Sequence, residues 1–271
     1  MMENVKSTIV WFLLILVSVV FVSCKKTPKA GADEIVINGK LTNSAGKVIW
    51  LSEFDGKSMH RIDSAYVEEN ESFSFTIKPK YAGFFIVSSH KNDNAFLIGN
   101  KGETIMLTGD AEHLSSTWNA RGSAETKRYL TYWNVSRKQL KQIDSLTVIF
   151  RSIHMEPDNL SLRIRMDSIF NALMETQRED ATHFINKNPG ALASLLVIDA
   201  KFSKLPLFYE ERDINYFKMI DSGLSKTYKG NPLVNNFHER VQQILKSIKY
   251  HQHNNRLLPP GELSPSYTTN R

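Results

Sequence analysis

The spacing of apolar residues changes once along this chain, at about residues 122–123, and no other feature of the sequence constrains the fold as strongly. Across residues 34–122, apolar and polar residues alternate in short runs that are separated by glycine, asparagine or aspartate. Phe73, Phe75 and Ile77 alternate with small polar residues, which places all three on one face of a strand. Seven or so such strands, spaced about 8–12 residues apart, predict an antiparallel β-sandwich or a barrel-like sheet.

Residues 123–256 show a helical pattern instead. Tyr129, Trp133 and Leu140 belong to a series of apolar residues spaced three or four apart, which produces one apolar helix face. Strands followed by helices, without βαβ alternation, predict an α+β fold in which an all-β domain (34–122) precedes an α-helical bundle. We expect the first helix to end at Pro157, a second to begin at Asn159 or Ser161 and break at Asn188, and further helices at 191–202, 210–224 and 235–251.

The first 23 residues have the pattern of a secretory signal. Lys6 precedes an apolar run at 8–22, which is shorter than the roughly 20 residues of a membrane-spanning helix. The single cysteine of the chain follows directly, as Cys24. This arrangement resembles a bacterial lipobox, in which the cysteine is lipidated at its thiol and becomes the first residue, although Phe21 stands where leucine is usual. We therefore predict a signal peptide at 1–23 and a lipidation site at Cys24.

Lipidation at Cys24 would make the lipid bilayer a partner of this chain. Several acyl chains hold a protein firmly on a membrane, whereas a single chain binds only marginally. Residues 24–33 contain lysine, proline, glycine and alanine and predict a lipidated, flexible tether. Lys25 stands where an aspartate retains well-studied bacterial lipoproteins at the inner membrane. This resemblance favours a cell-envelope location at the outer membrane, facing the periplasm.

Composition and charge exclude several classes of protein. Hydrophobic residues make up 41% of the chain and charged residues 23%, as in folded rather than disordered proteins. The chain has 34 basic and 28 acidic residues, but the two kinds are interleaved almost everywhere. Because a secreted lipoprotein does not meet nucleic acid, we predict no nucleic-acid partner despite the net charge of +6.

Few residues in the sequence suggest catalysis. One cysteine cannot form an internal disulfide, a CxxC redox pair or a cysteine-rich zinc site. His251 and His253 supply two imidazoles, one fewer than the three protein ligands of a typical catalytic zinc site, and the polar residues around them favour a solvated helix end. We therefore assign no catalytic, cofactor-binding or metal-binding residue, and we predict that the chain is not an enzyme.

Several short motifs, in their order along the chain, carry a family resemblance. The β half resembles the domain of unknown function that precedes the thioredoxin domain in many lipoproteins of Bacteroidota-type bacteria, the TlpA-like thiol–disulfide oxidoreductases. The motifs are Ile37-x-Gly39-x-Leu41, Val48-Ile49-Trp50-Leu51, Asp63-Ser64-Ala65-x-Val67, Phe73-x-Phe75, Gly122-Ser123, Ile185 to Pro189 leading into Ala193 to Leu196, and Pro260 to Tyr267.

The same resemblance defines what the chain does not contain. It implies that residues 257–271 are a linker-like tail and the start of a thioredoxin domain. A Trp-Cys-x-x-Cys pair should then lie beyond the region of Pro265, and the 271 residues hold no such pair. Thiol–disulfide exchange needs a thiolate nucleophile and a second cysteine to resolve the mixed disulfide, so no redox chemistry carries over to these residues.

A modification site is also suggested by resemblance. Asp63-Ser64-Ala65 resembles a protein O-glycosylation motif of the same bacteria, and Ser64 is therefore a candidate for glycosylation. The same Asp-Ser-apolar triplet recurs around Ser145 and Ser168, which lie on expected helices. Chance matches are the alternative interpretation for all three.

Three hypotheses for function follow. The first is a membrane-anchored, periplasm-facing lipoprotein that acts as a non-catalytic module and binds an envelope protein partner. The second is a truncated or split thiol–disulfide oxidoreductase. The third is a glycan- or small-ligand-binding module that uses aromatic residues such as Trp50, Trp118 and Trp133, although such residues more often belong to a core. A basic helix at 235–250 either lies on anionic lipid or packs its apolar side on its own domain.

Overall fold

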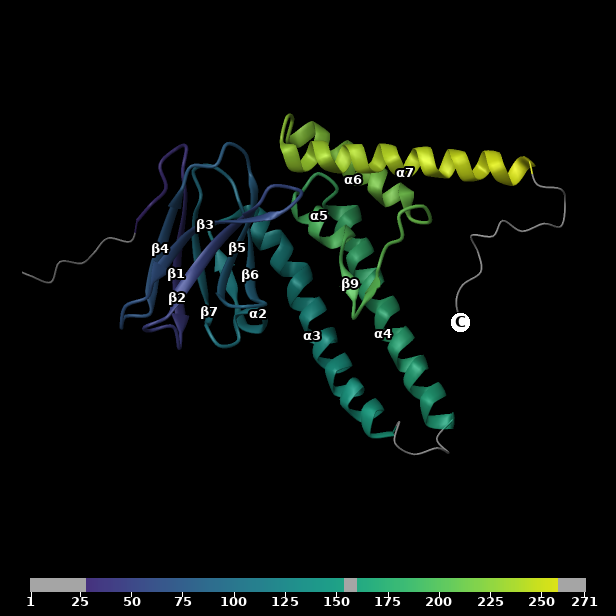
Figure 1. Ribbon diagram of the computed structural model, residues 1–271, viewed down its shortest axis with the longest axis horizontal. Helices are drawn as coiled ribbons and strands as arrows, with labels where there is room; N and C mark the ends of the chain where they lie inside the picture. Colours follow the sequence, from purple (N-terminus) through teal and green to yellow (C-terminus); the bar gives the residue numbers. More distant parts are fainter. Residues whose placement is uncertain (1–27, 154–159, 258–271) are drawn as a thin grey trace, which may run out of the picture.

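The computed structural model describes residues 28–153 and 160–257, over which two β-sheets are followed by several helices (Figure 1). The expected α+β fold is confirmed. The strands are β1 (Ile35–Thr42), β2 (Val48–Phe54), β3 (Met59–Tyr66), β4 (Ser72–Ile77), β5 (Gly83–His90), β6 (Asp93–Gly99), β7 (Thr104–Asp110), β8 (Asn119–Arg121), β9 (Lys201–Phe202) and β10 (Leu205–Pro206). The helices are α2 (Leu114–Thr117), α3 (Ala124–Ile153), α4 (Leu160–Lys187), α5 (Ala193–Ile198), α6 (Ile214–Thr227) and α7 (Pro232–Leu257). The predicted signal peptide, Cys24 and residues 258–271 of the predicted tail lie outside the described residues.

The two four-stranded sheets have the orders β4-β1-β7-β8 and β3-β2-β5-β6. Every pair of neighbours is antiparallel except β1 and β7, which run parallel. The β1–β7 pair thus departs from the antiparallel arrangement expected for this domain. Between β1 and β7 the chain crosses to the other sheet, so no hairpin fixes their relative direction.

The apolar residues of β4 face the packed interior between the sheets, as their alternation predicts. Phe73 and Phe75 are buried, and Phe73 lies opposite Gly39 of β1. A Cβ atom on Gly39 would lie 2.0 Å from Cζ of the Phe73 ring, so only glycine leaves room for the ring at this point. The glycine of the Ile37-x-Gly39-x-Leu41 motif thus has a packing role.

The start of α3 is fastened to the edge of the second sheet. Ser123 Oγ donates a hydrogen bond of 2.6 Å to the carbonyl oxygen of Ile98 on edge strand β6, and Thr126 Oγ1 donates to the same oxygen at 2.9 Å. The backbone N–H of Ile98 donates to Thr126 Oγ1 at 2.8 Å. The side chains of Ser123, just before α3, and of Thr126, within it, therefore satisfy backbone groups that an edge strand leaves unpaired.

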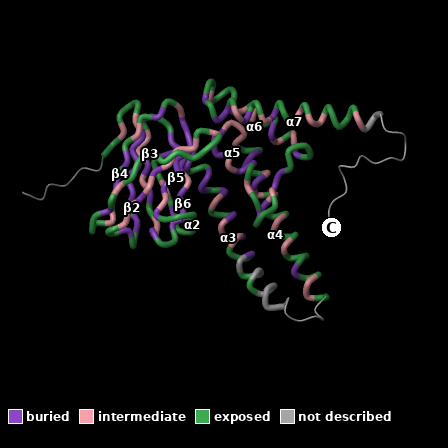
Figure 2. Tube along the Cα trace, viewed as in Figure 1, coloured by how far each residue is buried: buried purple, intermediate pink, exposed green. Residues whose placement is uncertain are grey.

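Helices α5 and α7 lie against the outer face of the β3-β2-β5-β6 sheet. Phe84 and Ile86 point outward from β5 and are nevertheless buried. Figure 2 shows buried residues along the strands of both sheets. A small hollow is lined by Phe84 together with Leu195 of α5 and Phe237 of α7. Buried apolar residues of the sheets and of the helices form one continuous cluster. The helical half is thus docked on the sheet.

Helices α3 and α4 form a long hairpin that projects away from the sheets (Figure 1). Polar side chains join them: Gln177 Nε2 donates to Ser136 Oγ at 2.6 Å, and Gln139 Nε2 donates to Asp180 Oδ2 at 2.9 Å. Within residues 28–153 and 160–257, no helix combines the length and the apolar character needed to cross a bilayer.

The boundaries of three expected helices need correction. The helix expected at 191–202 is α5 alone, and Phe202 belongs to strand β9. The helix expected from Glu210 begins at Ile214, after a turn, because Asp213 binds groups of the preceding loop. The helix expected from Asn235 begins at Pro232, since proline fits the first helical position, and it extends to Leu257, one residue into the predicted tail.

Candidate functional site

A groove of about 1510 Å³ lies between α7 and the segment that links α5 to α6. We call it the α7 groove. Its lining contains both apolar and charged side chains. It is lined by Ile198, Asp199, Lys201, Pro206, Phe208, Tyr209, Glu210, Glu211, Arg212, Arg240, Ile248, His251 and Gln252.

Arg240 holds one end of the α7 groove in place. Its Nε donates to Glu210 Oε1 at 2.7 Å and its Nη1 donates to Asp199 Oδ1 at 2.8 Å, so one guanidinium joins α7 to two points of the opposite wall. Burial alone would lower the pKa of Arg240, but the two carboxylates outweigh this effect and raise the pKa. Arg240 therefore stays charged and fixed at the groove.

Asp213 shapes the loop that forms the other wall. Arg178 Nη2 of α4 donates to Asp213 Oδ1 at 2.7 Å, and the backbone N–H of Tyr209 donates to Asp213 Oδ2 at 2.7 Å. Arg212 binds the same carboxylate at 3.1 Å, and Arg178 also donates to the carbonyl oxygen of Leu207. The nearly buried carboxylate of Asp213 thus holds the loop that precedes α6 against α4.

The far end of the groove contains one of the two histidines singled out in the sequence. Glu211 accepts a hydrogen bond of 2.6 Å from Ser247 Oγ, and His251 Nδ1 lies 3.2 Å from the other carboxylate oxygen. Hydrogen bonding from Ser247, with a smaller effect of His251, lowers the pKa of Glu211. His253 is exposed, and among the described residues no three His, Cys, Asp or Glu side chains are grouped to hold a metal.

The α7 groove has the chemistry of a binding surface. Its volume exceeds the roughly 300–1,000 Å³ of typical small-molecule pockets. Its lining has three carboxylates and, besides His251, three cationic side chains, and it has no serine, threonine or cysteine that could act as a nucleophile. A partner with charges of both signs and some apolar surface would complement it.

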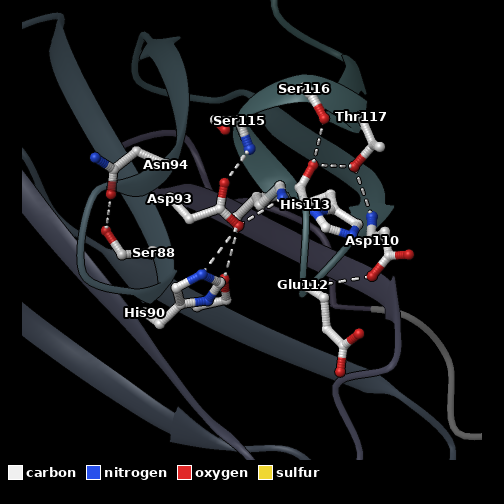
Figure 3. A network of polar contacts seen from close by, with 12 residues as sticks. Ser88, His90, Asp93, Asn94, Asp110, Glu112, His113, Ser115, Ser116 and Thr117 are labelled. Carbon is white, nitrogen blue, oxygen red and sulfur yellow. Dashed lines mark hydrogen bonds and ion pairs between the residues drawn. The ribbon is translucent and has the colours of Figure 1, made fainter.

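A second polar cluster lies where β5 and β6 meet α2 (Figure 3). Asp93 Oδ2 accepts the backbone N–H of Leu114 at 2.6 Å, and Oδ1 accepts that of Ser115 at 2.7 Å. Burial would raise the pKa of Asp93, but these bonds and the Ser115 hydroxyl lower it. The carboxylate therefore satisfies the first N–H groups of α2 and has a structural role.

Ser89 and His90 lie beside Asp93, yet they do not form a catalytic triad. Ser89 Oγ is 3.1 Å from His90 Nδ1 and donates directly to Asp93 at 3.3 Å, while His90 Nε2 is 3.9 Å from the carboxylate. In a triad the histidine stands between the hydroxyl and the carboxylate and is hydrogen-bonded to both. Here Ser89 donates to the carboxylate itself, and His90 Nε2 is too far from Asp93 for a hydrogen bond. The carboxylate therefore does not orient the imidazole to accept the serine proton.

Ser64, the candidate glycosylation site, lies exposed on strand β3 opposite Trp50. Its backbone N–H donates to the carboxylate of Asp63 at 2.7 Å. Ser145 and Ser168 are exposed on α3 and α4. Cys24, the candidate lipidation site, is not among the described residues. Among the described residues, no hydrogen bond or ion pair joins Ser64 to a residue of the α7 groove.

The aromatic residues do not form a ligand surface together. Trp118 is buried and Trp133 half-buried, which confirms their interpretation as core residues. Trp50 lies on the outer face of its sheet, but the guanidinium of Arg61 covers its ring at 4.0 Å from the centroid. The apolar side of α7, including Phe237 and Val241, packs on its own domain as expected for this basic helix.

Comparison with known families identifies the first part of the chain. Residues 35–129 match the family model described as Domain of unknown function (DUF4369). These residues are a DUF4369 domain. No curated protein and no solved structure matches the chain. The DUF4369 domain contains the two four-stranded sheets, α2 and the first residues of α3, so the α7 groove is built entirely from residues that follow it.

Proposed function

We propose that this chain is a lipoprotein of the cell envelope, held through acylated Cys24 at the outer membrane and facing the periplasm. Its folded body binds a partner polypeptide and catalyses no reaction. The signal-like run at 8–22 and the position of the single cysteine support the anchor. The α7 groove carries the proposal for the body.

The α7 groove suits an extended or helical segment of another protein. It is too large for a typical small ligand, and Arg240 and Asp213 hold its walls in fixed positions before a partner arrives. Asp199 and Glu210 line the groove together with Lys201 and Arg212, so a partner of mixed charge finds complementary groups there. These are the properties of a specific and moderately polar protein interface.

The alternative, that this chain is one part of a thiol–disulfide oxidoreductase, rests on the family resemblance. The resemblance implies a domain of unknown function in the β half, and residues 35–129 match the DUF4369 model. Under this alternative the partner of the groove carries a Trp-Cys-x-x-Cys pair. The identity of the partner therefore distinguishes a pure binding module from the accessory part of a redox enzyme.

Site-specific photo-crosslinking in living cells tests the proposal. A photoreactive residue at Gln252, which lines the α7 groove, should give an adduct with one identifiable envelope protein. The matched control is Gln242, an exposed glutamine of the same helix that does not line the groove. Tyr209, on the opposite wall of the groove, is a second position for the photoreactive residue. Binding in the groove would be contradicted by equal adducts from Gln252 and Gln242, or by the absence of adducts from both Gln252 and Tyr209.

A further inference from the structure

A second hollow, of about 510 Å³, lies between α3 and the connection from α2 to β8. We call it the α2–α3 hollow. Residues 116–119 form one wall, and Asn134, Arg137, Lys138 and Lys141 form the other. The spacing of three, four and seven residues places these four side chains on one face of α3.

The charge of this hollow is entirely of one sign. Its ionisable lining residues are Arg137, Lys138 and Lys141, and no carboxylate lines it. The α7 groove, by contrast, balances its cationic side chains with carboxylates. Lys138 and Lys141 are exposed, and neither forms an ion pair within residues 28–153 and 160–257. Three cations on one wall repel each other, and a bound anion would relieve that repulsion.

Arg137 is held ready for a ligand. Its Nη1 donates to the carbonyl oxygen of Ser116 at 2.7 Å and its Nη2 donates to Asn134 Oδ1 at 2.9 Å. These bonds use two of the five N–H donors of the guanidinium and fix its position between the two walls. The other donors have no acceptor among the described residues. A pre-positioned arginine fork is the geometry that suits phosphate oxygens.

The nearby acidic residue Asp110 does not neutralise the hollow. Its backbone N–H donates to Thr117 Oγ1 at 2.9 Å, and its carboxylate accepts from the N–H of Glu112 at 2.9 Å (Figure 3). The same carboxylate also accepts from Asn43 Nδ2 at 3.0 Å. The carboxylate is therefore engaged away from α3. The amide groups of Asn134 and Asn119, whose Oδ1 atoms already accept hydrogen bonds, leave their N–H donors for a ligand.

We propose that the α2–α3 hollow binds a phosphate group, either of a soluble phosphate ester or of a phospholipid headgroup. Arg137 supplies the planar fork, Lys138 and Lys141 supply the charge that a dianionic or monoanionic phosphate needs, and the volume accommodates a small headgroup. This site is independent of the α7 groove and of the partner proposed for it.

Calorimetric titration of the purified full chain, kept in a neutral detergent, tests this site. The probes are inorganic phosphate, glycerol 1-phosphate and soluble dihexanoyl phosphatidylglycerol. The Lys138→Ala/Lys141→Ala variant should weaken binding by about tenfold or more, because charge-assisted hydrogen bonds to phosphate are lost. Both lysines are exposed, and circular dichroism checks that the variant stays folded.

The matched control is Lys226→Ala/Lys229→Ala, which removes the same charge from two exposed lysines at the end of α6. It should leave the affinity within about twofold of the wild type, since surface charges at a distance are screened by salt. A tighter response to the short-chain lipid than to glycerol 1-phosphate would assign the site to a headgroup, and equal responses would assign it to soluble esters. Absence of binding for all three probes, or an equal loss in the control variant, would overturn the proposal.

Discussion

Replacement of Asp213 by asparagine is expected to lower the free energy of unfolding by about 2–3 kcal/mol. The Asp213 side chain is 6% exposed and accepts hydrogen bonds from Arg178, Arg212 and the N–H of Tyr209. Asparagine keeps the shape but removes the charge, so the partly buried guanidinium of Arg178 loses its counter-ion. Urea denaturation of the full chain measures the change.

Asp199→Asn is the matched control for this prediction. Asp199 also pairs with an arginine, Arg240, but its side chain is 54% exposed. Exposed ion pairs contribute about 0–1 kcal/mol, so this variant should unfold close to the wild type. If Asp213→Asn were no more destabilising than Asp199→Asn, the loop of the α7 groove would not depend on the buried carboxylate.

The effect of Asp213→Asn should also depend on pH. Burial alone would raise the pKa of Asp213, but the bonds from Arg178, Arg212 and Tyr209 outweigh it and lower the pKa. A carboxyl group with a lowered pKa stabilises the fold above its unfolded pKa, and this contribution disappears as the pH falls through the folded pKa. The difference in stability between wild type and variant should therefore be full at neutral pH and shrink below about pH 4. A difference that stays constant down to pH 2 would contradict this account.

Gly122→Ala is expected to destabilise the chain by about 4 kcal/mol or to prevent folding. Gly122 has a φ angle of +100°, and a Cβ atom there would lie 1.9 Å from the carbonyl oxygen of Thr104. Thr104 belongs to β7, which is paired on both sides by β1 and β8 and cannot move away easily. The substitution therefore combines backbone strain with a clash against a fixed strand.

Gly230→Ala separates these two causes. Gly230 also has a positive φ angle, +76°, but a Cβ atom there would meet nothing within 4 Å. Only the conformational cost of about 1–2 kcal/mol should remain. Urea denaturation of the two variants should differ by more than the error of the measurement, and similar values would show that the contact with Thr104 is unimportant.

The sequence predicts the local elements well because each has a repeating signal. Strand alternation around Phe75 and helical spacing around Trp133 gave the correct types of structure, and the step at residues 122–123 marks the actual start of α3. The parallel pairing of β1 with β7 has no such signal, because it depends on where the chain returns after visiting the other sheet. The helix expected from Glu210 begins later for a similar reason, because the turn before Ile214 depends on the contact of Asp213 with the distant residue Arg178.

The α7 groove could not be predicted from the sequence. Its walls are joined by single ion pairs between distant residues, such as Arg240 with Asp199 and Arg178 with Asp213. A lone charged residue on a helix does not reveal its partner, and Arg240 lies within the basic helix expected at 235–250. The sequence does contain a signal for the start of α7, one wall of the groove. Asparagine followed by proline, here Asn231 and Pro232, is typical of a helix start.

The anchor at Cys24 is the central claim of this account, and mass spectrometry of the N-terminal peptide of the mature chain tests it most directly. The predicted result is a peptide that begins at Cys24 and carries acyl groups on that residue, and a Cys24→Ala variant that leaves the membrane fraction. A mature chain whose Cys24 thiol is unmodified, or an alanine variant that still fractionates with the membrane, would contradict it.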